Sequence, residues 1–522
     1  MKILLVYPNH KGMNMLPPAI GLLSACLKRE NHSVELFDTT YYNSVDVNGQ
    51  KDSTDSDESK SDRLMARPYK MPNEITVKYT NVYTDFEQHV KMFNPDLIGL
   101  SCTEDMFHLG IGLLEKIKHL KIKTIVGGVF ATFAPELVLS YDSVDIVCKG
   151  EGEDALIELC NRLDKGVNYL DIPNLWFKTK DKIISNPTKM IDMDSNPLID
   201  MSLFEDARFY RPMGGKVYRM FPVETHRGCP FKCAFCNSPS QMSLYKTEAN
   251  SNYLRRKSFK NIRKELLFYK NEMKAEYLYF WADTFFSWSR GDFDKFCEIY
   301  EEISLPFWCQ TRPETVSKSR LNKLKKIGCR RISFGVEHGN STFRKKYLNR
   351  QMTNDTLTES LNLVNKVGID YSVNNIIGFP YETRKLAFDT INLNKTFFAN
   401  DRNAYPFTPF SGTPLRKVCE NLGFVKKNDI VQSMIANGSI LDMPQFRRSA
   451  VNGIVKTFNM YVNFPESRWP EIRKAEGESK ESAKIYNNLK LEYQEKYWNK
   501  SVSFETSSKE LDPIDDLTLV GV

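Results

Sequence analysis

The sequence predicts an α/β protein with two parallel sheets: a doubly wound N-terminal domain, a partial (β/α)6 barrel, and a helical C-terminal extension. Three observations predict it. The N-terminal part alternates β-rich apolar runs with amphipathic segments, the central part repeats this alternation six times, and the remainder has helical periodicity. The 522 residues, 41% of them hydrophobic, suffice for several cores. The predicted boundaries are 1–165, a connector at 166–215, a barrel at 216–420 and an extension at 421–522.

In the first domain, five short apolar runs are predicted as parallel strands, with amphipathic helices expected at 19–30 and 106–119. The stretch 44–63 is rich in Asp, Ser and Lys and almost free of aliphatic residues. It is therefore expected to be a solvated, disordered insertion. The predicted strands are 2–7, 33–37, 97–101, 124–126 and 146–148.

The connector is punctuated by Pro and Asp and predicts a small hairpin near 175–184. Six strand-like segments follow, each separated from the next by a Lys-rich helical segment, which implies a parallel barrel or an open part of one. They are 218–224, 277–281, 307–310, 331–336, 371–377 and 403–410. Helices are expected at 446–462 and 478–498, before a polar tail from about 501.

Charge and hydropathy exclude several classes of protein. Lys and Arg number 72 against 65 Asp and Glu, and this small excess is too dilute for a dedicated nucleic-acid binder. No apolar run approaches the ~20 residues that span a bilayer. The N-terminal apolar stretch ends at Pro8, which is too short for a signal-peptide core. We therefore expect a cytoplasmic protein that has neither a membrane nor a nucleic acid as its partner.

Three of the eleven cysteines are clustered in Cys-Pro-Phe-Lys-Cys-Ala-Phe-Cys, as Cys229, Cys233 and Cys236, while the other eight are scattered. Three thiolates on one loop can hold three corners of a [4Fe–4S] cluster and leave the fourth iron open to another ligand. A structural zinc site normally has four protein ligands. His226 stands only three residues before Cys229, and there is no distant Cys-x-x-Cys partner. The pattern therefore favours the cluster over zinc.

With Phe235, these cysteines match Cys-x-x-x-Cys-x-aromatic-Cys in full, and the region 215–420 resembles the radical S-adenosylmethionine superfamily. Segments 281–285, 310–313, 335–340, 375–382 and 409–414 match in the expected order. The resemblance implies that the open iron chelates S-adenosylmethionine and that one electron cleaves this cofactor to a 5′-deoxyadenosyl radical. It also implies that Phe235 lies near the adenine and that Glu337 accepts hydrogen bonds from the ribose. Gln310, Arg350 and Asn374 are further candidates for the cofactor site.

In doubly wound sheets, ligands bind outside the carboxyl ends of the strands. Gly127 and Gly128 follow a predicted strand there, and they suit either close approach of a flat ligand or a tight turn. Together with the barrel, the N-terminal region resembles the Rossmann-like, cobalamin-binding domain of one class of radical S-adenosylmethionine enzymes. The Asp-x-His-x-x-Gly pattern that ligates cobalt in many cobalamin proteins is absent, so His10 is not expected to be a ligand. The candidate cobalamin contacts are Ser101, Thr103, Gly127, Gly128, Gly150 and Glu151.

The resemblance implies a cobalamin-dependent methyltransferase that acts on an unactivated carbon of a small-molecule substrate. One alternative is a radical cyclase, rearrangement enzyme or oxidation enzyme in which cobalamin is structural or absent. Another is a non-enzymatic, metal-stabilised binding protein. A flavodoxin or ferredoxin is the expected source of electrons. The sequence assigns neither the substrate nor general acid and base residues, because the cofactors carry the chemistry in this class.

Overall fold

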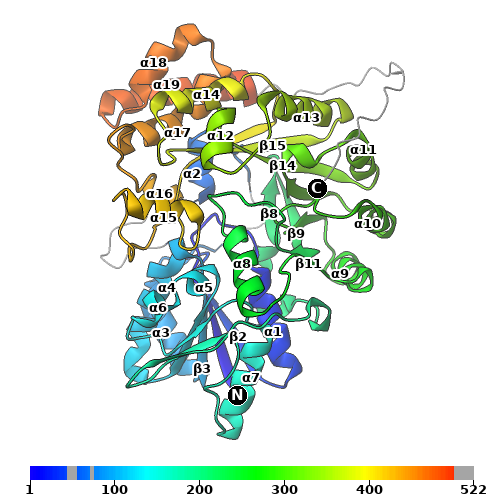
Figure 1. Cartoon of the computed structure of the whole chain (residues 1–522), viewed down its shortest axis with the longest axis vertical. Helices are drawn as coiled ribbons and strands as arrows, with labels where there is room; N and C mark the ends of the chain where they lie inside the picture. The colour runs from blue at the N-terminus through cyan, green and yellow to red at the C-terminus, as the bar shows by residue number, and fades with distance from the viewer. Residues whose placement is uncertain (44–55, 71–75, 499–522) are drawn as a thin grey trace.

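The computed structural model of the chain describes residues 1–43, 56–70 and 76–498. Its N-terminal domain forms one end of an elongated molecule, the barrel lies in the middle, and the C-terminal helices cover the far end (Figure 1). No helix in the described part of the chain is long and apolar enough to cross a membrane. The predicted tail from about 501 lies outside the described residues.

The N-terminal sheet has the strand order β2-β1-β3-β4-β5-β6-β7. Its parallel strands are β1 (Lys2–Tyr7), β2 (Ser33–Asp38), β3 (Leu97–Ser101), β4 (Lys123–Gly127) and β5 (Ile146–Cys148). Successive apolar side chains of these strands point in turn into two cores, one on each face of the sheet. One core packs under α1 (Pro18–Arg29) and α7 (Glu153–Lys165), and the other packs under α3 (Val82–Phe93) and α4 (Phe107–Ile117), with the short α5 (Val129–Phe133) and α6 (Pro135–Leu139). This is the predicted doubly wound domain.

The second sheet has the order β16-β15-β14-β13-β12-β9-β8, and its strands β9, β12, β13, β14, β15 and β16 are all parallel. These six strands correspond to the six predicted ones, while β8 (Tyr210–Met213) adds an antiparallel edge. The partial barrel is therefore confirmed. Its parallel strands are β9 (Lys216–Val223), β12 (Tyr277–Phe280), β13 (Phe307–Thr311), β14 (Cys329–Glu337), β15 (Asp370–Ile377) and β16 (Asp401–Pro406). The helices on its outside are α9 (Phe259–Asn271), α10 (Arg290–Ile303), α11 (Lys318–Lys326), α13 (Asn354–Val367) and α14 (Arg384–Asn394).

Two local expectations need correction. The predicted hairpin exists as β6 (Leu175–Lys178) and β7 (Ile183–Ser185), but it extends the N-terminal sheet rather than standing in a separate connector. Within the insertion that was expected to be disordered, residues Ser56–Asp62 form the helix α2. Residues 44–55 of that insertion lie outside the described residues.

The segment after α2 covers the edge strand β16 of the barrel. Leu64 and Met65 are buried, and the Met65 Sδ accepts a hydrogen bond from the backbone N–H of Ala404 at 3.3 Å. The Nδ2 of Asn459 donates both to the Leu64 carbonyl, at 3.0 Å, and to the Arg402 carbonyl, at 2.9 Å. The segment that follows α2 therefore helps to cover a sheet edge whose backbone groups would otherwise lack partners.

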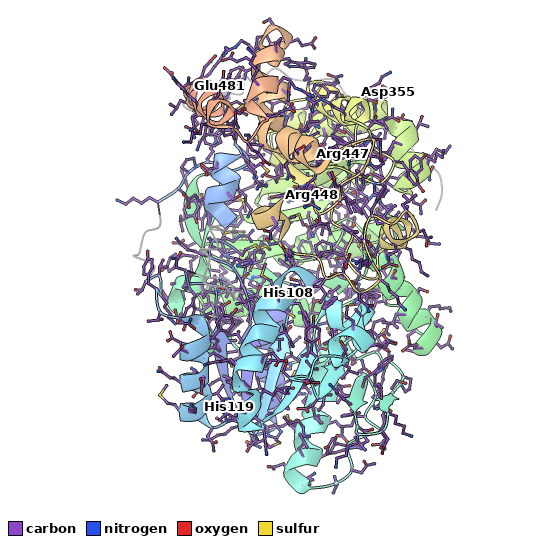
Figure 2. The ribbon with its side chains drawn as sticks, turned by 90° about the vertical axis from the view of Figure 1, so that its left-hand side faces the viewer. His108, His119, Asp355, Arg447, Arg448 and Glu481 are labelled. Carbon is purple, nitrogen blue, oxygen red and sulfur yellow. The ribbon has the colours of Figure 1, made fainter. Side chains whose placement is uncertain are left out.

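Asn459 belongs to α17 (Arg448–Asn463), the most buried helix of the C-terminal extension. The extension also contains α16 (Met434–Asn437), α18 (Trp469–Ala475) and α19 (Lys480–Tyr493), and α15 (Pro414–Asn421) leads into it from the barrel. In Figure 2, His108 of α4 marks the N-terminal half of the molecule. Arg447 and Arg448, at the start of α17, lie above it and mark the C-terminal half.

Candidate active site between the two sheets

A cavity of about 370 Å³ lies between the carboxyl ends of the N-terminal strands and the mouth of the barrel. Leu5, Leu22, Ile125 and Leu156 give it an apolar wall from the N-terminal domain. The barrel side contributes residues that follow its first two parallel strands. These are Glu224, His226, Arg227, Gly228, Trp281 and Asp283.

Five of the six predicted cobalamin contacts line this cavity. They are Ser101, Gly127, Gly128, Gly150 and Glu151. The sixth, Thr103, is not among the lining residues, and its hydroxyl donates to the Asp105 carboxylate at 2.5 Å. His10 does not line the cavity either.

The two adjacent glycines serve different purposes. Gly128 has φ +105°, and a Cβ there would lie 2.3 Å from the Cys102 carbonyl oxygen. Gly128 is therefore required by the close approach of two backbone segments. At Gly127 the nearest atom to an added Cβ is the Cβ of Cys148, at 3.6 Å, so its missing side chain widens the cavity. The apolar wall and this bare backbone fit a large flat cofactor.

An ion-pair network that the sequence did not reveal joins the two domains beside the cavity. Arg227 lies 2.6 Å from Glu151, 2.7 Å from Glu153 and 2.9 Å from Glu224, and Arg255 also contacts Glu151. Burial would lower the pKa of Arg227, but the three carboxylates raise it well above its usual value. The sequence offered one indication that Arg227 belongs to the site, which is its position two residues before the first clustered cysteine.

The cluster loop, residues 229–237, runs from β10 (His226–Arg227) to α8 (Ser238–Glu248) and carries the three clustered cysteines. All three are free thiols. The Nη1 of Arg312 donates to the Cys233 Sγ at 3.1 Å, and its guanidinium lies 3.7 Å from the centre of the Phe231 ring. The Sγ of Cys229 lies 3.3 Å from the Thr284 hydroxyl, and the Cys236 Sγ accepts from the backbone N–H of Ser238 at 3.4 Å.

These soft donors fit a cluster bound by thiolates. Burial raises the pKa of Cys229, and it raises the pKa of Cys236 to about 12. Loading the cluster must therefore release protons from these thiols. Within the described ranges, no group of three or more His, Cys, Asp or Glu side chains is already arranged around a single metal ion.

Glu337 and Arg350, two predicted cofactor residues, form a buried pair with 3.1 Å between Arg350 Nη1 and Glu337 Oε1. Burial raises the pKa of Glu337, and Arg350 offsets part of this shift. Glu337 ends β14 with φ +66°, which is unusual for a residue other than glycine. A Cβ at Gly335 would lie 2.0 Å from Glu337 Oε1, so the glycine makes room for this carboxylate.

The other predicted cofactor residues are placed by the neighbouring strands. Gln310 of β13 is half-buried and donates to the Ala282 carbonyl at 3.2 Å. Asn374 of β15 accepts from Asn403 of β16 at 2.9 Å. Phe235 lies 6.0 Å, ring centre to ring centre, from Phe379, which follows β15.

A fully buried pair, His338 and Glu382, ties the ends of β14 and β15 together, with 3.2 Å between Nε2 and Oε1. The second carboxylate oxygen of Glu382 accepts from the N–H groups of Gly378 and Phe379 at 2.6 and 2.9 Å. Sequence reasoning assigned no role to either residue, although both lie in segments that carried the resemblance. Glu382 therefore holds the loop that carries Phe379 through these two hydrogen bonds, and His338 brings the loop that follows Glu337 next to it.

Comparisons with known proteins identify both domains. The family model of the Radical SAM superfamily matches residues 223–393, and that of the B12 binding domain matches residues 71–160. An uncharacterized methyltransferase of Pyrococcus horikoshii is 25% identical over 342 residues, which are 64% of this chain and 71% of that protein. The anaerobic magnesium-protoporphyrin IX monomethyl ester cyclase of Rubrivivax gelatinosus is 23% identical over 414 residues, which are 74% of this chain and 70% of that protein.

Two solved structures share the fold. The radical S-adenosylmethionine methyltransferase TsrM from Kitasatospora setae, with cobalamin and a [4Fe–4S] cluster bound, aligns with a TM-score of 0.58 at 17% identity, over 81% of this chain and 75% of TsrM. The cobalamin-dependent S-adenosylmethionine radical enzyme OxsB aligns with a TM-score of 0.62 at 15% identity, over 94% of this chain and 71% of OxsB.

The two domain matches confirm the predicted fold and the predicted cofactor set of a [4Fe–4S] cluster, S-adenosylmethionine and cobalamin. The chain therefore belongs to the radical S-adenosylmethionine enzymes that contain a cobalamin-binding domain.

Proposed function

We propose that this enzyme is a methyltransferase that methylates an unactivated carbon of a small-molecule substrate. The observation that carries the proposal is the cavity, because residues of the cobalamin-binding domain and residues next to the cluster loop line the same space. When bound, the cluster and S-adenosylmethionine supply a radical that removes a hydrogen atom, and cobalamin supplies the methyl group. A shared cavity would let both cofactors reach one substrate atom.

The chain's own residues would bind and orient these groups. Cys229, Cys233 and Cys236 would hold the cluster, and Arg312 would stabilise the thiolate of Cys233 through its charge-assisted hydrogen bond. Glu337, held by Arg350, would accept from the ribose hydroxyls.

On the cobalamin side, the backbone of Gly127 and the neighbouring apolar wall would contact the cofactor and exclude water. Phe235 would pack beside the adenine. Gln310 and Asn374 would provide polar groups in the barrel interior, where the substrate must enter.

A second candidate is a radical cyclase. The relative from Rubrivivax gelatinosus, a cyclase by name, favours this function, since the match covers 74% of this chain. A cyclase and a methyltransferase share the hydrogen-abstraction step and differ in whether a methyl group reaches the product.

Purified, anaerobically reconstituted enzyme tests the proposal. We expect about four irons and near one cobalt per chain, reductant-dependent 5′-deoxyadenosine, and S-adenosylhomocysteine as the sign of methyl transfer. S-adenosylmethionine with a deuterated methyl group should label the product. Iron and 5′-deoxyadenosine without cobalt or S-adenosylhomocysteine would favour the cyclase, and zinc in place of iron would overturn both.

Two cysteine variants serve as the matched comparison. Cys233→Ala should lose the cluster and 5′-deoxyadenosine formation together. Cys419→Ala changes a buried free cysteine on α15, outside the cluster loop, and should keep both. Retention of the cluster in Cys233→Ala would contradict the assignment of the ligands.

A further inference from the structure

The helix α12 (Ser341–Tyr347) lies directly beside the cluster loop. The carbonyl of Leu348, at the end of α12, accepts from the backbone N–H of Ala234 at 3.1 Å. The next residue, Asn349, donates from Nδ2 to the Lys232 carbonyl at 2.9 Å. The end of α12 and the cluster loop therefore form one continuous surface, and α12 lies on the face of the molecule turned toward the viewer in Figure 1.

This surface is basic. Lys232, Lys345 and Lys346 are all exposed, and among the described residues none of them forms an ion pair. Lys232 stands between the predicted cluster ligands Cys229 and Cys233. Positive charge that is not neutralised by neighbouring carboxylates is thus concentrated where the cluster loop reaches the surface.

A stacked aromatic pair, the half-buried Tyr347 and the exposed Tyr381, lies on the same surface. The rings of Tyr347 and Tyr381 stack with their centres 5.0 Å apart, and the Lys346 Nζ lies 4.9 Å from the centre of the Tyr347 ring. The side chain of Tyr381 is 43% exposed, and its φ of +68° is strained for a residue other than glycine. Such strain concentrates at functional sites, and exposed tyrosines are enriched in protein interfaces. We call Lys232, Lys345, Lys346, Tyr347 and Tyr381 the α12 face.

Aromatic side chains connect the α12 face with the cluster loop. The ring of Phe343 lies 4.8 Å from that of Tyr347 and 6.1 Å from that of Phe379. Phe379 in turn lies 6.0 Å from Phe235, the residue before Cys236. Contiguous packing therefore leads from the tyrosine pair to the cluster loop, which places a partner bound here close to the cluster.

We propose that the α12 face is the docking site for an acidic one-electron carrier protein that reduces the cluster. This inference rests on the proposed function, since each cleavage of S-adenosylmethionine requires one electron. The carrier loses one electron and is oxidised, and the cluster gains that electron and is reduced, with no atom transferred. Lysines attract an acidic partner over a distance, and the tyrosine pair supplies an apolar contact at the centre.

The test compares two charge-reversal variants of the full-length holoenzyme. K345E/K346E changes the α12 face and spares Lys232, which is too close to the cluster ligands. K260E/K264E is the matched control, because these lysines are exposed on α9 and form no ion pair among the described residues. Both variants change the net charge equally, and iron content and circular dichroism verify that each is loaded and folded.

Each protein is assayed for 5′-deoxyadenosine with dithionite and, separately, with reduced flavodoxin as the acidic carrier. With dithionite, we expect wild-type rates from both variants. With flavodoxin at low salt, we expect kcat/KM for flavodoxin to fall at least about tenfold in K345E/K346E, which corresponds to about 1.4 kcal/mol, and to stay unchanged in the control. The difference should shrink as salt rises. Equal behaviour of the two variants with flavodoxin would overturn the docking site.

A binding measurement separates this inference from the proposed function. Calorimetric titration of the holoenzyme with flavodoxin requires no turnover. Loss of binding in K345E/K346E alone supports the α12 face even if the product proves to be unmethylated. If the wild-type enzyme forms no 5′-deoxyadenosine with dithionite, the proposed function fails. Unchanged flavodoxin binding in K345E/K346E would refute the docking site, whatever the result for the proposed function.

Discussion

Glu151 and Arg227 join the two sheets through an ion pair with 2.6 Å between Oε1 and Nη1. Glu151 follows β5 of the N-terminal sheet, and Arg227 stands two residues before Cys229. The side chain of Glu151 is only 4% exposed. The position of the cluster loop relative to the cavity therefore depends on a charge contributed by the other domain.

Replacing Glu151 with Ala should destabilise the protein. The change leaves Arg255 without this carboxylate and Arg227 with two partners instead of three. Breaking a buried pair costs about 3 kcal/mol. Urea unfolding followed by fluorescence measures the loss. Asp171→Ala is the control, because Asp171 pairs with Arg162 but is 69% exposed, and an exposed pair contributes about 1 kcal/mol or less. Equal losses in the two variants would contradict the importance of the domain contact.

The same network predicts sensitivity to acid. Burial alone would raise the pKa of Glu224, but Arg227 and Lys257 outweigh it and hold the pKa below its usual value. A lowered folded-state pKa gives stability that is present above the unfolded pKa of about 4.3 and is lost as the pH falls through the folded value. We expect the melting temperature of the wild type to fall more steeply than that of Glu224→Gln from about pH 5 downward. Parallel curves would refute this role of Glu224.

The adjacent glycines give opposite predictions. Gly128→Ala places a Cβ 2.3 Å from a backbone oxygen at φ +105°, so it should lower the free energy of unfolding by at least about 1–3 kcal/mol. Gly127→Ala meets only an ordinary contact and should leave stability unchanged, while its methyl group reduces the space for cobalamin. We expect weaker cobalamin binding by Gly127→Ala in a spectroscopic titration. Wild-type affinity in this variant would remove Gly127 from the cofactor site.

Periodicity in the sequence predicted most of the fold. The strands Lys2–Tyr7 and Leu97–Ser101 each contain a continuous apolar run, because the central residues of parallel strands are buried on both faces. The cluster cysteines were predictable because their ligand spacing is local. The ion pair of Glu151 with Arg227 was not, since it joins residues 76 positions apart and charged side chains have no periodic signature.

The helix α2 was missed for a similar reason. Its sequence, Ser-Asp-Glu-Ser-Lys-Ser-Asp, has no apolar stripe, and polar composition by itself predicted disorder. Its support comes from distant residues: Lys490 of α19 lies 2.5 Å from Asp62, and the Tyr486 hydroxyl donates to the Asp62 carbonyl. Tertiary contacts therefore override a local preference here.

Removing the buried amide of Asn459 should release the covering segment from the barrel edge. Asn459→Ala leaves the carbonyls of Leu64 and Arg402 without this donor, which costs about 1–3 kcal/mol for each buried group left unsatisfied. Limited proteolysis should then cut within residues 56–70 faster than in the wild type. Asn421→Ala, at an exposed position on α15, should change neither stability nor cleavage. Unchanged cleavage in Asn459→Ala would show that other contacts hold the segment.

Arg312 should tune the reduction potential of the cluster. Its Nη1 donates to the Cys233 Sγ at 3.1 Å, and its positive charge stabilises added negative charge on the reduced cluster. We expect Arg312→Leu to retain iron but to have a more negative potential. A loss of about 1.4 kcal/mol corresponds to about 60 mV for a one-electron couple. Redox titration followed by electron paramagnetic resonance measures the shift. Arg320→Leu is the control and should keep the wild-type potential, because Arg320 is half-buried and donates to the carbonyls of Phe286 and Thr315 rather than to a cluster cysteine. An unchanged potential in Arg312→Leu would mean that this hydrogen bond only orients the cluster loop.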